Sequence, residues 1–235
     1  MELKGRVAVI TGASRGIGAA TARRLAAGGM TLALLGRDER ALEAVAAQCQ
    51  EGASGVGVFA GDLSDEVFRR DVFPDIQQQL GAIHALVNNA GMLDFAAADQ
   101  ADMTTWDRML DVNFRSWVHL TNYALPHLLE HHESAVINLC SVAGRETFAG
   151  GAMYTATKHA VHAWARCMFD DLSARGLKVC TIYPGYVDTD MVTFVEGNRA
   201  NMIQADDVAR AVEFALCFPK SACPTEIVIR RQRPL

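Results

Sequence analysis

Residues 8–18, AVITGASRGIG, decide the fold of this chain. A run of small and β-branched apolar residues ends at Thr11, and glycines follow at positions 12, 16 and 18. The run has the composition of a buried strand, and the residues after the glycines have the pattern of a helix. Glycine permits positive φ and lets another surface come close to the backbone. The stretch therefore predicts a strand that turns tightly into a helix and presents its backbone to a ligand.

Apolar runs of similar length recur along the chain and alternate with longer helical patterns, the longest at residues 102–131 and 152–175. Continuous apolar strands that alternate with amphipathic helices indicate a parallel sheet covered on both faces. We predict an α/β fold with a doubly wound, parallel, seven-stranded sheet (Rossmann fold). No linker or repeat divides the sequence, so we expect a single domain over residues 1–235. The predicted strands are residues 7–11, 32–36, 55–62, 84–91, 135–141, 178–185 and 226–230.

The composition is that of a globular protein and argues against several classes of function. Half of the 235 residues are hydrophobic, and a net charge of −5 gives no basis for binding nucleic acid. No apolar segment approaches the length of a membrane span, and the first apolar run is too short for a signal peptide. The six cysteines form no CxxC pair, so we expect reduced thiols and a cytoplasmic protein.

One motif resembles a metal site without its full ligand set. HLLEH at residues 127–131 has the HxxEH spacing of one class of zinc protease. It ends a helical stretch, follows Pro126 and has no evident third ligand, so we expect no metal.

The glycine stretch has the features of an anion site. A strand–turn–helix unit brings backbone N–H groups and the N-terminus of a helix to one point, which favours a pyrophosphate. The spacing here is GxxxGxG rather than the commoner GxGxxG. The alternative is a glycine-rich turn that simply packs a helix on a strand.

The end of the second strand refines the ligand. An acidic residue there binds a ribose 2′-OH, whereas an arginine suits a 2′-phosphate. The chain has Gly36 at this place and Arg37 after it, and Arg15 of the glycine stretch is expected to face the same point. We therefore favour NADP(H) as cofactor. The alternative is NAD(H) bound through Asp38, which also suits the N-cap of the next helix.

A second group of residues predicts acid–base chemistry. Ser141 ends the fifth apolar run, and Tyr154 and Lys158 follow four residues apart on a helical pattern. Residues at i and i+4 lie on one face of a helix, so the phenol and the ammonium are expected to share one site. A nearby cation favours the phenolate of a tyrosine, whose ordinary pKa near 10 is too high for acid–base work at neutral pH.

Five motifs in this order resemble those of the short-chain dehydrogenase/reductase family, in its short, single-domain form. The resemblance covers about residues 3–230 and rests on TGASRGIG (11–18), NNAG (88–91), Asn113 in DVNFRS, the Ser141, Tyr154 and Lys158 set, and YPGYVDT (183–189). It implies an oxidoreductase that interconverts a ketone or aldehyde and the matching alcohol by hydride transfer with NADP(H). It implies Asn113, Ser141, Tyr154 and Lys158 as the catalytic residues.

The resemblance also assigns roles. Tyr154 donates or accepts the proton, Lys158 binds the nicotinamide ribose and lowers the tyrosine pKa, Ser141 orients the carbonyl, and Asn113 holds a water of a proton relay. The implied cofactor site consists of Gly12, Ser14, Arg15, Gly16, Ile17, Gly18, Arg37, Asp62, Leu63, Asn89, Ala90, Gly91, Tyr154, Lys158, Pro184, Gly185, Val187 and Thr189.

Several features leave the substrate and assembly open. The segment over the substrate site, residues 186–204, is short, which suggests an open pocket. Arg145 is either a carboxylate-binding residue or a solvated surface arginine. The family implies a homodimer or homotetramer formed through residues 102–131 and 152–175. An NAD-linked alcohol or hydroxysteroid dehydrogenase, and a nucleotide sensor without catalysis, are the alternative functions.

Overall fold

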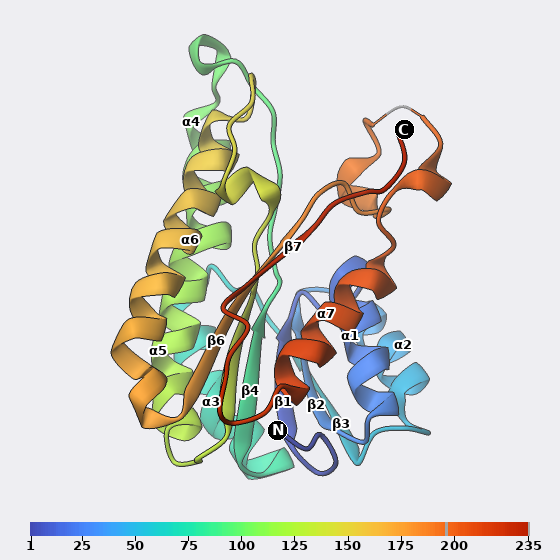
Figure 1. Cartoon of the computed structure of the whole chain (residues 1–235), viewed down its shortest axis with the longest axis vertical. Helices are drawn as coiled ribbons and strands as arrows, with labels where there is room; N and C mark the ends of the chain where they lie inside the picture. Colours follow the sequence, from blue (N-terminus) through green and yellow to red (C-terminus); the bar gives the residue numbers. More distant parts are fainter. Residues whose placement is uncertain (196, 235) are drawn as a thin grey trace.

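The computed structural model describes residues 1–195 and 197–234, and its centre is a parallel sheet of seven strands. The strand order is β3-β2-β1-β4-β5-β6-β7, so the chain reverses direction across the sheet between β1 and β4 (Figure 1). The strands are β1 (Val7–Thr11), β2 (Thr31–Gly36), β3 (Gly55–Ala60), β4 (Ile83–Asn88), β5 (Ser134–Leu139), β6 (Leu177–Pro184) and β7 (Glu226–Ile229). The predicted fold class is confirmed.

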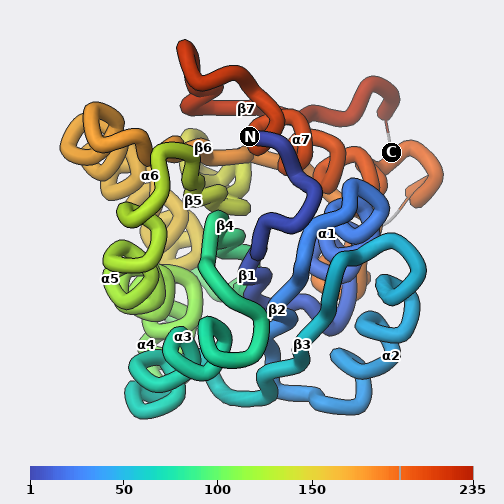
Figure 2. Tube along the Cα trace, turned by 90° about the horizontal axis from the view of Figure 1, so that it is seen from below, coloured from blue at the N-terminus to red at the C-terminus, as the bar shows by residue number. Residues whose placement is uncertain are grey.

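Two layers of helices cover the sheet. Figure 2 shows α1, α2 and α7 on one side of the row of strands and α3 to α6 on the other. The helices are α1 (Gly16–Ala27), α2 (Glu39–Cys49), α3 (Glu66–Leu80), α4 (Met103–Leu110), α5 (Ser116–Leu128), α6 (Ala152–Leu172) and α7 (Ala205–Cys217). No helix in the described part of the chain is long and apolar enough to cross a membrane.

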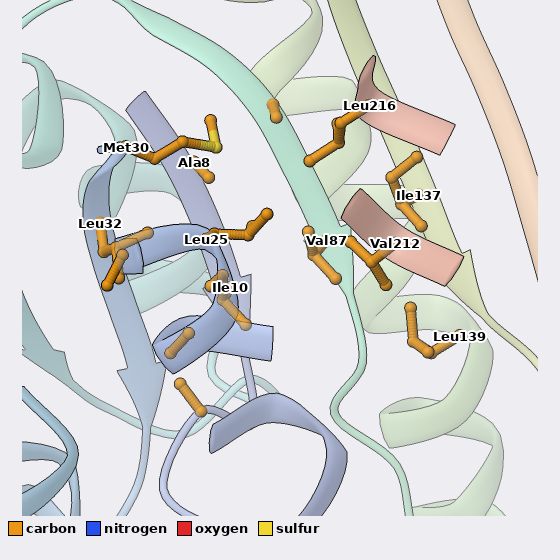
Figure 3. Close-up of a cluster of buried hydrophobic side chains, with 14 of the residues drawn as sticks. Ala8, Ile10, Leu25, Met30, Leu32, Val87, Ile137, Leu139, Val212 and Leu216 are labelled. Atoms are coloured by element: carbon orange, nitrogen blue, oxygen red, sulfur yellow. The ribbon is translucent and has the colours of Figure 1, made fainter. Parts of the chain in front are cut away.

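The alternation of side chains along each strand explains why both layers form. Along β1, Ala8 and Ile10 belong to the cluster under α1 and α7, whereas Val7 and Val9 belong to the cluster on the opposite face. All are 3% exposed or less. Figure 3 shows the first cluster, where Leu25 of α1 and residues of α7 meet the strands. A strand buried on both faces needs apolar residues at every position, as the sequence shows.

The boundaries differ from the predicted ones where the chain leaves the sheet. Five strands end one to three residues earlier than predicted, and for four of them this leaves Asp62, Asn89, Ser141 and Gly185 in loops beyond β3, β4, β5 and β6. The long helical pattern at 102–131 is divided into α4, one π-helical turn (Asp111–Arg115) and α5. The residues between the observed and the predicted strand ends are mostly glycine or polar, so these positions belong to the loops at the carboxyl edge rather than to the strands.

Candidate active site

Thr11 joins the ends of the two strands at which the sheet reverses. Its hydroxyl accepts hydrogen bonds from the backbone N–H groups of Asn89 (2.9 Å) and Ala90 (3.0 Å) and donates to the carbonyl of Val87 (3.3 Å). The Asn89 amide in turn donates to the carbonyls of Thr11 (2.8 Å) and Gly12 (3.2 Å). The NNAG segment (88–91) is therefore bonded to the start of the glycine-rich residues 12–18, called the glycine loop below, at the carboxyl edge where α/β sheets bind ligands.

The glycine loop has a geometry that fits a pyrophosphate. Gly12 and Gly16 have φ of 63° and 55°, and a Cβ on Gly18 would lie 2.2 Å from the carbonyl oxygen of Gly12. The loop is thus packed closely against its own backbone, in agreement with the packing interpretation of these glycines. Helix α1 nevertheless begins without a side-chain cap and without an acid in its first turn. Its first N–H groups have no partner within the helix and suit an anion.

The residues after β2 differ in how they are used. Asp38 is the N-cap of α2 and accepts a hydrogen bond from the N–H of Ala41 at 3.1 Å. The Arg37 side chain is 62% exposed and lies 3.9 Å from the carboxylate of Asp62. Burial acts to raise the pKa of Asp62, but hydrogen bonds from Ser64 and the charges of Arg37 and Arg108 outweigh it, so the net shift is downward. A carboxylate and a guanidinium therefore stand together beyond β2 and β3.

The segment after β6 covers the glycine loop. A Cβ on Gly16 would lie 3.3 Å from the Thr189 methyl group, so these two predicted cofactor residues are neighbours. Val187 is 5% exposed and forms a bridge with Ile203, which closes the segment 186–204 on itself. Arg15 lies 3.6 Å from Asp190, with both side chains about three-quarters exposed, so it faces this segment.

Asn113 lies in the π-helical turn and is fully buried. Its side-chain oxygen accepts from the N–H of Met92 (2.8 Å), and its amide donates to the carbonyl of Met92 (2.9 Å) and to the hydroxyl of Thr157 (3.3 Å). The extra residue of a π turn shifts the helix register, a feature often found at functional sites. Asn113 therefore links the loop after β4 to α6, which carries the predicted acid–base pair.

Tyr154 and Lys158 face the same buried region from α6, as their spacing predicts. The Lys158 ammonium lies 5.8 Å from the centre of the Tyr154 ring and 4.6 Å from that of Trp117, and donates to the carbonyl of Leu139 at 3.3 Å. Trp117 is fully buried and its indole N–H donates to the Ala90 carbonyl at 2.8 Å. Trp117 therefore connects the NNAG segment to the lysine.

Burial dominates the titration of this pair in the chain alone. It raises the pKa of Tyr154 to about 12, with the Ser141 hydroxyl acting in the opposite direction. It also lowers the pKa of Lys158, against the effect of the Cys140 thiol. Ser141 begins the short turn Val142–Gly144, where its hydroxyl oxygen accepts from the N–H of Ala143 at 3.1 Å. The hydroxyl is therefore fixed beside the phenol.

Three residues near the site were not identified from the sequence. Thr11, Trp117 and Thr157 each bond to a predicted site residue or its backbone. Trp117 follows Asn113 by four positions, which is also the spacing of Tyr154 and Lys158. This spacing is the feature of the sequence that could have placed Trp117 on the same helix face as Asn113. The role of Thr11 depends on contacts with residues far along the chain and leaves no local pattern.

Arg145 and the HLLEH segment, for which the sequence allows more than one interpretation, contact other residues of the chain. Arg145 donates to Glu226 of β7 at 2.7 Å, so its guanidinium is already paired with a carboxylate. Of the HLLEH motif, His127 stacks on Phe73 at 6.2 Å, whereas His131 stacks on His84 at 4.4 Å. Within residues 1–195 and 197–234, no three potential ligands gather as a metal site would require.

The reversal point, the glycine loop and the buried Tyr154–Lys158 pair define a dinucleotide-binding α/β protein. The chain belongs to the short-chain dehydrogenase/reductase family, because residues 6–200 match the family model described as short chain dehydrogenase. This family consists of oxidoreductases that act on CH–OH groups.

Individual relatives support the same assignment over the whole length. An uncharacterized oxidoreductase of Staphylococcus epidermidis is 34% identical over 97% of this chain and 98% of its own, and one of Staphylococcus aureus is 32% identical over 97% and 98%. Among solved structures, a double phenylalanine-to-leucine variant of a Serratia marcescens short-chain dehydrogenase/reductase superposes with a TM-score of 0.90, at 28% identity over 98% of each chain. A metagenomic short-chain oxidoreductase in complex with NADP gives 0.86, at 28% identity over 99% of this chain and 100% of that one.

Proposed function

We propose that this oxidoreductase interconverts a ketone or aldehyde and the corresponding alcohol with NADP(H), and that Tyr154 donates or accepts the proton. The observation that carries the proposal is the buried Tyr154–Lys158 pair beside Ser141. The bound nicotinamide supplies or accepts the hydride. The remaining steps belong to the chain: Ser141 orients the carbonyl oxygen, and Tyr154 holds the proton that this oxygen takes.

The protonation state of Tyr154 in the chain alone is the one that carbonyl reduction requires. With a pKa of about 12 in the chain alone, its phenol keeps its proton at neutral pH and so carries the proton that a carbonyl oxygen takes. Abstraction of a proton from an alcohol needs the phenolate, which additional positive charge near the ring would favour. We assign Lys158 this effect and the binding of the nicotinamide ribose. Because the Asn113 amide is bonded to Met92 and Thr157, its backbone is the part that would hold a relay water.

The preference for NADP(H) over NAD(H) rests on the residues after β2. Asp38 already caps α2, whereas the guanidinium of Arg37 is largely exposed to a ligand. We place the 2′-phosphate at Arg37 and the pyrophosphate at the first turn of α1. That a relative of the same fold is described in complex with NADP supports this assignment.

The experiment is the consumption of NADPH and NADH over a panel of aldehydes, ketones, diketones and keto esters, with Tyr154→Phe as the matched variant. We expect turnover with NADPH and a loss of at least about 10²-fold in kcat for the variant, because a phenyl ring cannot transfer the proton. Turnover that persists in the variant contradicts the role of Tyr154. Tight NADPH binding without any turnover across the panel supports the nucleotide-sensing alternative.

Assembly and compartment are further parts of the proposal. We propose a homodimer or homotetramer formed through α4, α5 and α6, which light scattering during size-exclusion chromatography tests. The six cysteines are all free thiols in the structure, which supports a reducing compartment such as the cytoplasm.

A further inference from the structure

Three phenylalanine rings from separate loops meet beyond the carboxyl edge of the sheet. Phe95 follows β4, Phe148 precedes α6, and Phe194 belongs to the segment 186–204. The ring centre of Phe95 lies 5.7 Å from that of Phe148 and 4.7 Å from that of Phe194, the latter in an edge-to-face arrangement. In Figure 1 the loop after β4 and the segment 186–204 rise on opposite sides of this edge, so the Phe95–Phe194 contact joins the two sides.

These rings remain open to solvent although they contact one another. Phe95 is 40% exposed, Phe148 43% and Phe194 50%. Exposed aromatic surface gathered in one place, rather than scattered singly, marks a site that another apolar group covers. Each ring therefore presents apolar surface to solvent.

Two of the three rings, Phe95 and Phe148, belong to segments that are attached to the start of α6, the helix that carries Tyr154. Ala96, next to Phe95, forms a bridge with Gly151, and its N–H donates to the carbonyl of Gly150 at 3.0 Å. Gly151 is the N-cap of α6, and Tyr154 lies in the first turn of this helix. Met92 and Leu93 of the same loop pack against the cluster that contains Tyr154. The loop that carries Phe95 therefore also carries residues that pack against the cluster containing Tyr154.

Several arginines of the surrounding loops are paired with acids. Four arginines border this region, and each pairs with an acid: Arg15 with Asp190, Arg145 with Glu226, Arg199 with Asp188 and Arg230 with Glu146. A carboxylate or phosphate on the substrate would compete with these acids for the four guanidinium groups, at the modest cost of an exposed ion pair. An uncharged, aromatic group would meet the rings without that cost.

We propose that Phe95, Phe148 and Phe194 form a subsite for an aromatic portion of the substrate, so that the protein prefers aryl carbonyl compounds over short aliphatic ones. This inference rests on the proposed function. The segment 186–204 supplies one ring of the subsite, and its Thr189, which accepts a hydrogen bond from Arg199 of the same segment at 3.2 Å, lies against Gly16 of the glycine loop. Substrate recognition and the covering of the cofactor loop are thereby joined in one segment.

The test compares two keto esters that differ only in phenyl against methyl, ethyl benzoylacetate and ethyl acetoacetate. We expect the parent protein to favour the phenyl ester about tenfold or more in kcat/KM with NADPH. Phe95→Leu and Phe194→Leu keep apolar volume but remove a ring, and each is expected to lower this preference about three- to tenfold. The rate with ethyl acetoacetate is measured for each variant, so that a loss common to both esters is not counted as a loss of the phenyl preference.

The control is Phe214→Leu, because Phe214 of α7 is 53% exposed and also contacts a second ring, that of Phe218 at 5.2 Å. The proposal is overturned if the parent shows no phenyl preference, if the two subsite variants keep it, or if the control loses it equally. Since Phe95 and Phe194 touch, the double variant should lose little more than either single one.

A binding measurement separates this inference from the proposed function. Saturation-transfer NMR detects contact between the protein and the phenyl protons of ethyl benzoylacetate with NADP⁺ present and no turnover. Phenyl saturation in the parent that weakens in Phe194→Leu supports the subsite even where no carbonyl compound oxidises NADPH. Absence of phenyl saturation in the parent refutes the subsite even where reductase activity is found.

Discussion

Replacing Thr11 with valine tests how the cofactor edge of the sheet is held together. Thr11 is fully buried, and its one hydroxyl makes all three hydrogen bonds that a hydroxyl can make, two accepted and one donated. Valine has the same shape and removes only the hydroxyl. The variant therefore leaves the packing of β1 unchanged and removes the acceptor of the Asn89 and Ala90 backbone N–H groups, while the bonds from the Asn89 side chain to the backbone carbonyls remain.

The size of the effect follows from the groups left without partners. A buried donor that loses its acceptor costs about 1–3 kcal/mol, and here two backbone N–H groups are affected. Both lie in a half-buried segment, where water compensates in part. We expect the free energy of unfolding to fall by about 2–4 kcal/mol, which for a chain of this length corresponds to a melting temperature lower by about 5–15 °C. NADPH affinity should fall with it, because the glycine loop is bonded to the same segment.

Thr21→Val is the matched control. Thr21 is also fully buried, but its hydroxyl has no hydrogen-bond partner within the described part of the chain. Its replacement should leave the free energy of unfolding unchanged or raise it slightly. The assay is urea unfolding followed by circular dichroism, together with NADPH fluorescence titration. Equal stability and equal NADPH affinity in the two variants would refute the argument that Thr11 organises this edge.

Three further predictions concern pH, the glycine loop and the cofactor. Burial, with His131 and Arg6 contributing, lowers the pKa of His84 from 6.5 to about 4, and its ring accepts a backbone N–H of β1 at 3.2 Å. The contribution of His84 to the free energy of unfolding is therefore full above pH 6.5 and falls as the pH drops toward 4, by at most about 3 kcal/mol. His84→Asn keeps the hydrogen-bond acceptor and should make the melting temperature depend less on pH. An unchanged dependence of the melting temperature on pH contradicts this role of His84. Gly18→Ala should lower the free energy of unfolding by about 1–3 kcal/mol and weaken NADPH binding, because its Cβ meets backbone at 2.2 Å, whereas Gly55→Ala, with a nearest contact of 3.4 Å, should not weaken binding. Arg37→Asp should lower the ratio of kcat/KM for NADPH to that for NADH about tenfold or more, and an unchanged ratio favours the NAD-linked alternative.

The sequence predicts best those features that local periodicity controls. Continuous apolar runs predict a parallel sheet with all seven strands, because a strand covered on both faces must be apolar throughout. The i and i+4 spacing predicts that Tyr154 and Lys158 face one region, because helix geometry leaves no alternative. The capping role of Asp38 is also local, since the N-cap and the N–H group that it binds are three residues apart.

The features that escape prediction depend on partners far apart in the sequence. Arg145 is a candidate for binding a substrate carboxylate when only its position is known, yet it pairs with Glu226, 81 residues further along. The same holds for Thr11 with Asn89, separated by 78 residues. Neither pairing leaves a periodic pattern in the sequence, because the order of the strands in the sheet, and not closeness in sequence, brings the residues together. The function of such a residue depends on the groups to which its charge or hydroxyl is already bonded. Arg145, whose guanidinium is bonded to Glu226, shows that a residue near a site can already have a partner within the chain.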